Sequence, residues 1–201
     1  MVWRYSPVIL NHIHSAESHC AAFNTVARAL SGFTEECKLS FLEMYAKIRS
    51  RMGALGVVER GDAETLALAG RFAELAEKNS IRLSACGKPD LRPAGIPVSS
   101  CIDGALIQRI TGKAMSFKKD PGQRGVCACV ESVDVGSYQT CLNGCAYCYA
   151  NHSHAAATRK AACYDPESPF LCDTARPGDV ITDRAIRMHG ATGGQQLRLT
   201  L

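Results

Sequence analysis

The sequence predicts an α/β protein, built as a partial (β/α) barrel-like parallel sheet with a C-terminal, cysteine-rich, metal-dependent extension. Short apolar runs alternate with helical patterns of roughly 10–17 residues, as in parallel α/β architectures. From about Met115 the helical periodicity fades, and seven of the 11 cysteines lie between Cys127 and Cys172. A segment with so little apolar material usually needs metal or cross-links to hold one shape. We therefore expect a body over residues 1–114 and an extension over residues 115–201.

The first elements of the body are a strand and a helix. Two apolar runs, Val2–Tyr5 and Val8–Leu10, are separated by Pro7, which indicates a strand that enters an irregular turn. Ser15 is a good helix cap, and Gly32 lies just past the expected end of the helix. The buried face of this helix is predicted from the i, i+3, i+4, i+7 spacing of Phe23, Val26, Ala27 and Leu30.

Two further strands and three further helices complete the expected body. The strands are Cys37–Phe41 and Ile81–Ala85, and the second of them ends at Cys86. We expect Asp62 to cap a helix that runs to about Lys78, and Asp103 to cap a short helix with Leu106, Ile107 and Ile110. A further helical stripe is predicted between the two strands, from the spacing of Phe41, Met44, Tyr45, Ile48 and Met52.

Composition and charge exclude several classes of protein. Hydrophobic residues make up 46% of the chain and charged residues 21%, which is ordinary for a globular protein. No apolar run approaches the roughly 18 residues that a membrane-spanning helix needs, and the N-terminal segment lacks the pattern of a secretory signal. The net charge is +4 without a basic run, so nucleic acid is not an expected partner. We therefore expect a cytoplasmic protein. Disulfides rarely persist in such a reducing compartment, so the many thiols indicate metal binding.

The sharpest motif is Cys141-x3-Cys145-x2-Cys148. Asn143 and Gly144 favour a tight turn, so the three sulfurs can converge on one centre, with Tyr147 limiting the access of water. The spacing resembles the cluster loop of radical S-adenosylmethionine enzymes. That resemblance implies a [4Fe–4S] cluster whose fourth iron binds S-adenosylmethionine, with an electron donor that starts hydrogen abstraction from a substrate. The alternative is a zinc knuckle completed by one further ligand, either His152, Cys163 or Cys127.

Further motifs resemble the bacterial family labelled domain of unknown function 1848, which carries a C-terminal cysteine cluster similar to that of radical S-adenosylmethionine proteins. The matching segments are Trp3–Pro7, Cys101–Asp103, Gln123–Cys129, Asp134–Cys141, Cys145–Asn151 and Asp165–Leu171. Ser6 departs from the aspartate that the family usually has in its first motif. Family members also have βα units before that strand, so the chain resembles the C-terminal part of a longer barrel. We therefore expect a partner chain that completes the barrel, since an open sheet exposes strand edges.

A second metal site is predicted from Cys86, Cys101, Cys127 and Cys129. Cys86 ends an expected strand and Cys101 precedes an expected helix cap, which is where α/β proteins gather functional groups. Four cysteines suit either zinc or a second iron–sulfur cluster. The alternative is that Cys86 and Cys101 are buried thiols without a ligand role.

Two functions from different classes fit these motifs. The first is a radical S-adenosylmethionine-like iron–sulfur enzyme with an unidentified substrate. The second is a non-catalytic metal-binding module, which holds zinc or an electron-carrying iron–sulfur cluster. A fragment of a DNA-lesion lyase is a weaker third hypothesis, because the chain lacks a basic surface.

Overall fold

The computed structural model describes residues 1–170, 172–180 and 182. These residues form a mixed α/β fold around one parallel sheet of four strands in the order β1-β2-β3-β4. The strands are β1 (Val2–Val8), β2 (Glu36–Phe41), β3 (Arg82–Cys86) and β4 (Val98–Ser99). The helices are α1 (Ala16–Leu30), α2 (Arg49–Ala54), α3 (Asp62–Lys78), the 3₁₀ helix η1 (Pro89–Ala94), α4 (Gly104–Thr111) and α5 (His154–Ala161).

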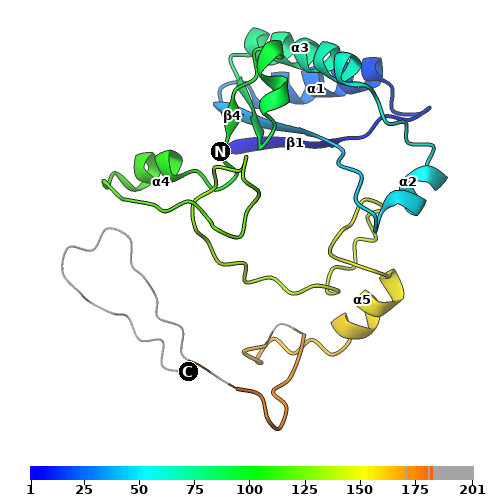
Figure 1. Cartoon of the computed structure of the whole chain (residues 1–201), viewed down its shortest axis with the longest axis vertical. Helices are drawn as coiled ribbons and strands as arrows, with labels where there is room; N and C mark the ends of the chain where they lie inside the picture. The colour runs from blue at the N-terminus through cyan, green and yellow to red at the C-terminus, as the bar shows by residue number, and fades with distance from the viewer. Residues whose placement is uncertain (171, 181, 183–201) are drawn as a thin grey trace.

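One face of the sheet carries the apolar core. Helices α1 and α3 lie together on this side, whereas the segment that leads to α5 lies on the other (Figure 1). Tyr5 of β1 packs edge-on against Phe23 of α1, with ring centroids 5.1 Å apart, and Phe23 lies 5.0 Å from Phe72 of α3. Both phenylalanines are fully buried, and each contributes about 1.5–3 kcal/mol through burial of its side chain.

The opposite face of the sheet is polar. Because side chains alternate along a strand, the residues between the core positions point away from α1 and α3. Lys38 of β2 is only 3% exposed, and its Nζ lies 3.1 Å from Oε1 of Glu36. The hydroxyl of Ser84 in β3 donates to the same Glu36 oxygen at 2.7 Å. Arg4 and Cys86 alternate with core residues in the same way, so the face that the extension approaches carries charged groups and a thiol.

Two expected helix caps are confirmed. The Oγ of Ser15 accepts a hydrogen bond from the N–H of Ser18, and the carboxylate of Asp103 accepts from the N–H groups of Ala105 and Leu106. The third cap is wrong by one position, because Asp62 is the first residue of α3 and Gly61 is the N-cap. An acidic residue in the first turn still stabilises the positive end of the helix.

Three other expectations need correction. Strand β1 continues through Pro7 to Val8, which an edge strand allows because it has a neighbour on one side only. The helical stripe expected from Phe41 to Met52 is a helix only from Arg49, because the Leu42 N–H bonds to the Val8 carbonyl and extends the strand pairing. Helix α5 lies in the segment where we expected no periodic structure.

The sheet of the described residues is open, and the barrel-like closure and the metal dependence of the extension stay predictions. The division at residue 114 is also a prediction, and residues 183–201 of the extension lie outside the described part. No helix in the described ranges is long and apolar enough to cross a bilayer.

Candidate metal centre

Three of the predicted ligands come together at the carboxyl end of the sheet. Cys86 is the last residue of β3, and Cys127 and Cys129 reach it from the extension. Their sulfur atoms all lie within 4.8 Å of one another. Cys127 and Cys129 are each only 5% exposed, so two of the three thiols are shielded from solvent. Among the described residues, no other set of three His, Cys, Asp or Glu side chains meets this distance.

Backbone hydrogen bonds hold the Cys127–Cys129 segment in place. Asp120 N–H donates to the Cys129 carbonyl at 3.0 Å, and Cys127 N–H donates to the Arg124 carbonyl at 2.9 Å. The segment is also fixed to the loop after β4, since Ser100 Oγ donates to the Ala128 carbonyl at 2.7 Å. The position of both thiols therefore depends on contacts between the extension and the body.

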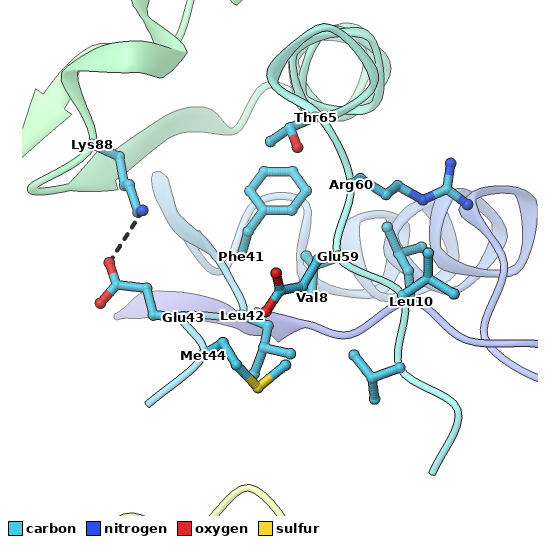
Figure 2. Close-up of a pocket in the computed structure, with 12 residues that line it drawn as sticks. Val8, Leu10, Phe41, Leu42, Glu43, Met44, Glu59, Arg60, Thr65 and Lys88 are labelled. Carbon is cyan, nitrogen blue, oxygen red and sulfur yellow. Dashed lines mark ion pairs between the residues drawn. The ribbon is translucent and has the colours of Figure 1, made fainter. Parts of the chain in front are cut away.

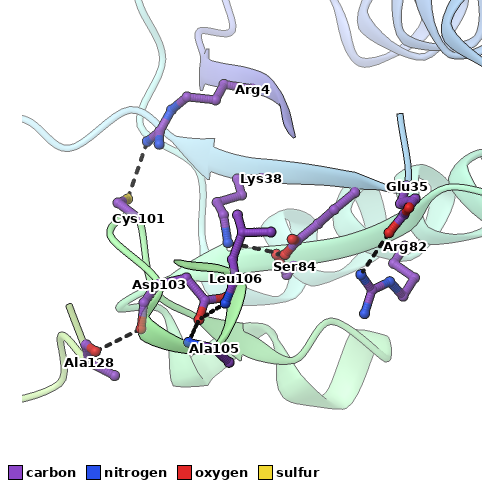
Figure 3. Close-up of polar contacts among 12 residues, drawn as sticks. Arg4, Glu35, Lys38, Arg82, Ser84, Cys101, Asp103, Ala105, Leu106 and Ala128 are labelled. Carbon is purple, nitrogen blue, oxygen red and sulfur yellow. Dashed lines mark hydrogen bonds and ion pairs between the residues drawn. The ribbon is translucent and has the colours of Figure 1, made fainter. Parts of the chain in front are cut away.

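Cys101, the fourth predicted ligand, borders this group. Its backbone N–H donates to the Cys129 sulfur at 3.2 Å, and the Ile102 N–H donates to the same sulfur at 3.4 Å. The Cys101 thiol accepts a hydrogen bond from the Arg4 guanidinium at 3.3 Å (Figure 3), and it is close enough to Cys86 to raise the pKa of that thiol. Cys101 therefore borders the group of Cys86, Cys127 and Cys129, but its sulfur does not lie within 4.8 Å of all three.

The surroundings favour a negative charge on Cys129. Burial opposes ionisation of this thiol, but hydrogen bonds from the N–H of Ile102, from Cys127 and from the N–H of Cys101 outweigh burial and lower its pKa. Burial raises the pKa of Cys86, and its thiol neighbour Cys101 adds to the effect. The pKa of one sulfur is thus lowered while that of its neighbour Cys86 is raised, and a bound cation would favour the thiolate form of both.

Glu43, just after β2, binds Arg124, which lies just before the Cys127–Cys129 segment. Its carboxylate lies 3.1 Å from Lys88 Nζ and accepts two hydrogen bonds from Arg124 at 2.9 Å. Burial opposes its ionisation, but hydrogen bonds from Arg124, Tyr45 and Lys88 prevail and lower its pKa to about 2. The Glu43–Lys88 pair borders a cavity of about 370 Å³ at the ends of β1 and β2 (Figure 2).

The Cys141–Cys148 loop forms a separate site. Gly144 has a φ of 65°, as the expected turn requires, and Cys148 N–H donates to the Cys145 carbonyl at 3.0 Å. Cys141 and Cys145 are exposed, and Cys148 is partly buried. Their sulfurs do not meet the 4.8 Å distance. A cubane cluster does not require it, because each of its thiolates binds a different iron.

Side chains outside the motif anchor this loop. Asn151 Nδ2 donates to the Cys141 carbonyl at 2.6 Å, and Asn151 N–H donates to the Cys148 sulfur at 3.3 Å. Arg51 of α2 donates to the Cys148 carbonyl at 2.8 Å. Nearby, a hollow of about 510 Å³ is lined by Tyr45, Ala46, Lys47, Tyr138 and Tyr149. The loop therefore sits against the segment that follows β2.

The family model described as "Domain of unknown function (DUF1848)" matches residues 1–150. The chain belongs to this family. The matched residues include both cysteine sites, from Cys86 to Cys148. No curated protein and no solved structure matches the chain significantly.

Sequence reasoning about this DUF1848 chain left the anchoring residues unassigned. The ion pair of Glu43 with Arg124 and the contact of Arg51 with the loop join residues 81 and 97 positions apart, and no local pattern reports them. Arg4 was part of a recognised motif, but its partner Cys101 was not foreseen. Cys20 and Cys37 are buried in the core. Burial raises the pKa of Cys37 to about 12, which suits a structural thiol.

Proposed function

We propose that this protein is an iron–sulfur protein of the radical S-adenosylmethionine-like type, with one [4Fe–4S] cluster held by Cys141, Cys145 and Cys148. The observation that supports this proposal is the geometry of the motif. Three free thiols lie on a short loop turned at Gly144, and two of them are exposed and take no part in the core. Exposed thiols on a loop that other side chains anchor are available to a cofactor.

The donor set fits such a cluster. Iron–sulfur clusters are held by cysteine thiolates, and N–H donors to the sulfurs, such as Asn151 N–H to Cys148, tune them. A three-cysteine [4Fe–4S] cluster supplies one-electron chemistry and leaves one iron open for S-adenosylmethionine. The tyrosines of the neighbouring hollow, Tyr45, Tyr138 and Tyr149, offer ring faces on which an adenine can stack.

The test is anaerobic reconstitution with iron and sulfide, followed by reduction in the presence of S-adenosylmethionine. We expect about four irons and four sulfides at this site, and release of 5′-deoxyadenosine. Cys148→Ser removes a thiolate and should remove this iron and sulfide, whereas the matched change at exposed Cys163 should keep both. Full cluster content in Cys148→Ser would refute the assignment.

A second candidate function is a non-catalytic metal-binding module. The observation that favours it is the close group of Cys86, Cys127 and Cys129, which needs no S-adenosylmethionine chemistry to have a purpose. A reduced, metal-loaded protein that releases no 5′-deoxyadenosine would support this function over the first. Under either function, the many thiols support a reducing compartment such as the cytoplasm.

A further inference from the structure

We infer that Cys86, Cys101, Cys127 and Cys129 bind a single zinc ion with four thiolates, and that this ion fastens the extension to the sheet. This centre is independent of the proposed cluster at Cys141, Cys145 and Cys148.

The spacing of the sulfurs fits one metal ion. A tetrahedral zinc site has Zn–S bonds of about 2.3 Å, which sets its sulfurs about 3.8 Å apart. The sulfurs of Cys86, Cys127 and Cys129 are already within 4.8 Å of one another, so shifts of about 1 Å at most bring them to that spacing. A cubane would demand wider separations, because each thiolate would bind a separate iron.

Cys101 supplies the fourth ligand. Its thiol contacts the Cys86 thiol, and its backbone N–H donates to the Cys129 sulfur at 3.2 Å. The Cys101 sulfur now accepts a hydrogen bond from the Arg4 guanidinium at 3.3 Å and does not lie within 4.8 Å of all three other sulfurs, so zinc binding would require its side chain to move toward them. Structural zinc sites are closed by four protein ligands, which these four cysteines provide.

The charges around the group suit a four-thiolate zinc centre, which carries a net charge of about −2. The Arg4 guanidinium lies close enough to interact with the charge of Cys101, Cys86 and Cys129. Arg124 interacts with the charge of Cys86 from the other side, although its main partner is Glu43. Two arginines therefore offset the charge, and the N–H groups of Cys101 and Ile102 serve the Cys129 sulfur as outer-shell donors.

The ion would join three distant parts of the chain. Cys86 ends β3, Cys101 follows β4, and Cys127 and Cys129 belong to the extension. Hydrogen bonds already join the extension to the loop after β4, such as Ser100 Oγ to the Ala128 carbonyl at 2.7 Å and Val130 N–H to the Ile102 carbonyl at 3.1 Å. A metal bond at this junction supplies binding free energy that becomes folding free energy.

The experiment uses the full chain with Cys141, Cys145 and Cys148 all changed to Ser, so that any metal bound reports on this centre alone. We expect one equivalent of zinc, and Co²⁺ in its place should give the intense visible spectrum of a tetrahedral four-thiolate site. Adding Cys101→Ser should weaken zinc binding by tenfold or more and shift the cobalt spectrum toward three sulfurs. Cys163→Ser, at an exposed thiol outside the group, should change neither.

A second measurement needs no variant of this centre. Zinc in the triple-Ser protein should protect Cys86, Cys101, Cys127 and Cys129 from alkylation, and a chelator should expose all four, while Cys163 reacts in both states. Absence of bound metal in the folded triple-Ser protein would overturn the proposal, as would one site that holds iron together with sulfide. An unchanged four-thiolate cobalt spectrum in Cys101→Ser would also overturn it. Failure of the proposed cluster leaves these results unaffected.

Discussion

The backbone N–H of Cys101 donates a hydrogen bond to the sulfur of Cys129 across 3.2 Å, and so joins two residues 28 positions apart. Ile102 N–H adds a second donor to the same sulfur at 3.4 Å. Two N–H donors on one sulfur stabilise the thiolate over the thiol. The loop after β4 thus prepares a sulfur of the extension to bind a cation.

Substitutions at Arg4 test whether its positive charge supports zinc binding at the proposed four-cysteine centre. Arg4→Gln removes the positive charge beside Cys101, and we expect zinc affinity to fall by roughly 10–100-fold, the usual cost of losing an outer-shell partner. Arg4→Lys keeps the charge but loses the planar guanidinium donor, so its zinc affinity should lie between those of Arg4→Gln and wild type. Competition with a chromophoric chelator measures the affinity in each case. The control is Arg28→Gln in α1, and equal affinity in Arg4→Gln and the control would contradict the prediction.

Glu43 provides a pH-dependent test. Hydrogen bonds from Arg124, Tyr45 and Lys88 outweigh the effect of burial and lower its pKa from 4.5 to about 2, so its contribution to stability is full above pH 4.5 and is lost as the pH falls toward 2. At pH 7 we expect Glu43→Gln to lower the free energy of unfolding by about 1–2 kcal/mol. This range is reduced for solvent screening because the side chain is 23% exposed.

Urea titrations of wild type and Glu43→Gln between pH 7 and pH 3 measure this contribution as a difference. The difference should shrink below pH 4.5, because unfolded wild type then takes up a proton that folded Glu43 binds only near pH 2, whereas the Gln variant has no such group. Glu59→Gln is the control, because Glu59 is 64% exposed and lies 3.7 Å from Arg49. A stability difference that stays constant down to pH 3 would contradict the assigned role of Glu43.

Local signals in the sequence predicted the body well. Ser15 and Asp103 cap helices through bonds that span two or three residues, and such bonds depend on neighbours in the chain. The error after Phe41 has a tertiary cause, because Phe41 packs against Phe72 and the next N–H pairs with β1. Helix α5 does have a local signal in the sequence, since Ser153 caps it and alanines follow.

In the candidate site too, some features have a signal in the sequence and others depend on contacts between distant residues. Parallel strands place their carboxyl ends at one edge, which is why Cys86 and Cys101 were expected together. The sulfurs of Cys127 and Cys129 lie within 4.8 Å of that of Cys86, but the roles of Glu43 and Arg51 depend on contacts 81 and 97 positions away. A single sequence carries no sign of such contacts, because the partners share no spacing or periodicity.

The polar face of the sheet gives a stability prediction. Glu36→Gln leaves the buried ammonium of Lys38 without its negative partner, and we expect a loss of about 3 kcal/mol in the free energy of unfolding. Adding Lys38→Met removes the uncompensated charge and should recover most of this loss. Urea unfolding of the two variants checks the order. A double variant less stable than Glu36→Gln alone would show that the pair is not coupled in this way.

Gly70 lies inside α3, where we expect a substitution to stabilise the fold. A Cβ at this position meets nothing within 4 Å, so alanine fits without strain. Alanine also loses less backbone entropy than glycine on folding, and Gly70→Ala should raise the free energy of unfolding by about 0.5–1 kcal/mol. Thermal and urea unfolding both measure the effect. A decrease would mean that the helix packs more closely at Gly70 than its open surroundings indicate.

Gly144 tests the proposed cluster loop without touching a thiol. Its φ of 65° is costly for a residue with a Cβ, by about 1–2 kcal/mol, so Gly144→Ala should shift the loop away from its turn and lower the yield of reconstituted cluster. Gly144→Asn should retain more cluster than Ala, because asparagine tolerates the left-handed region better. Gly53→Ala is the control, since its Cβ meets nothing within 4 Å and no positive φ applies there. Iron and sulfide content after anaerobic reconstitution measures the cluster yield of each variant. A yield in Gly144→Ala equal to that in Gly53→Ala would contradict the prediction that cluster binding needs the turn at Gly144.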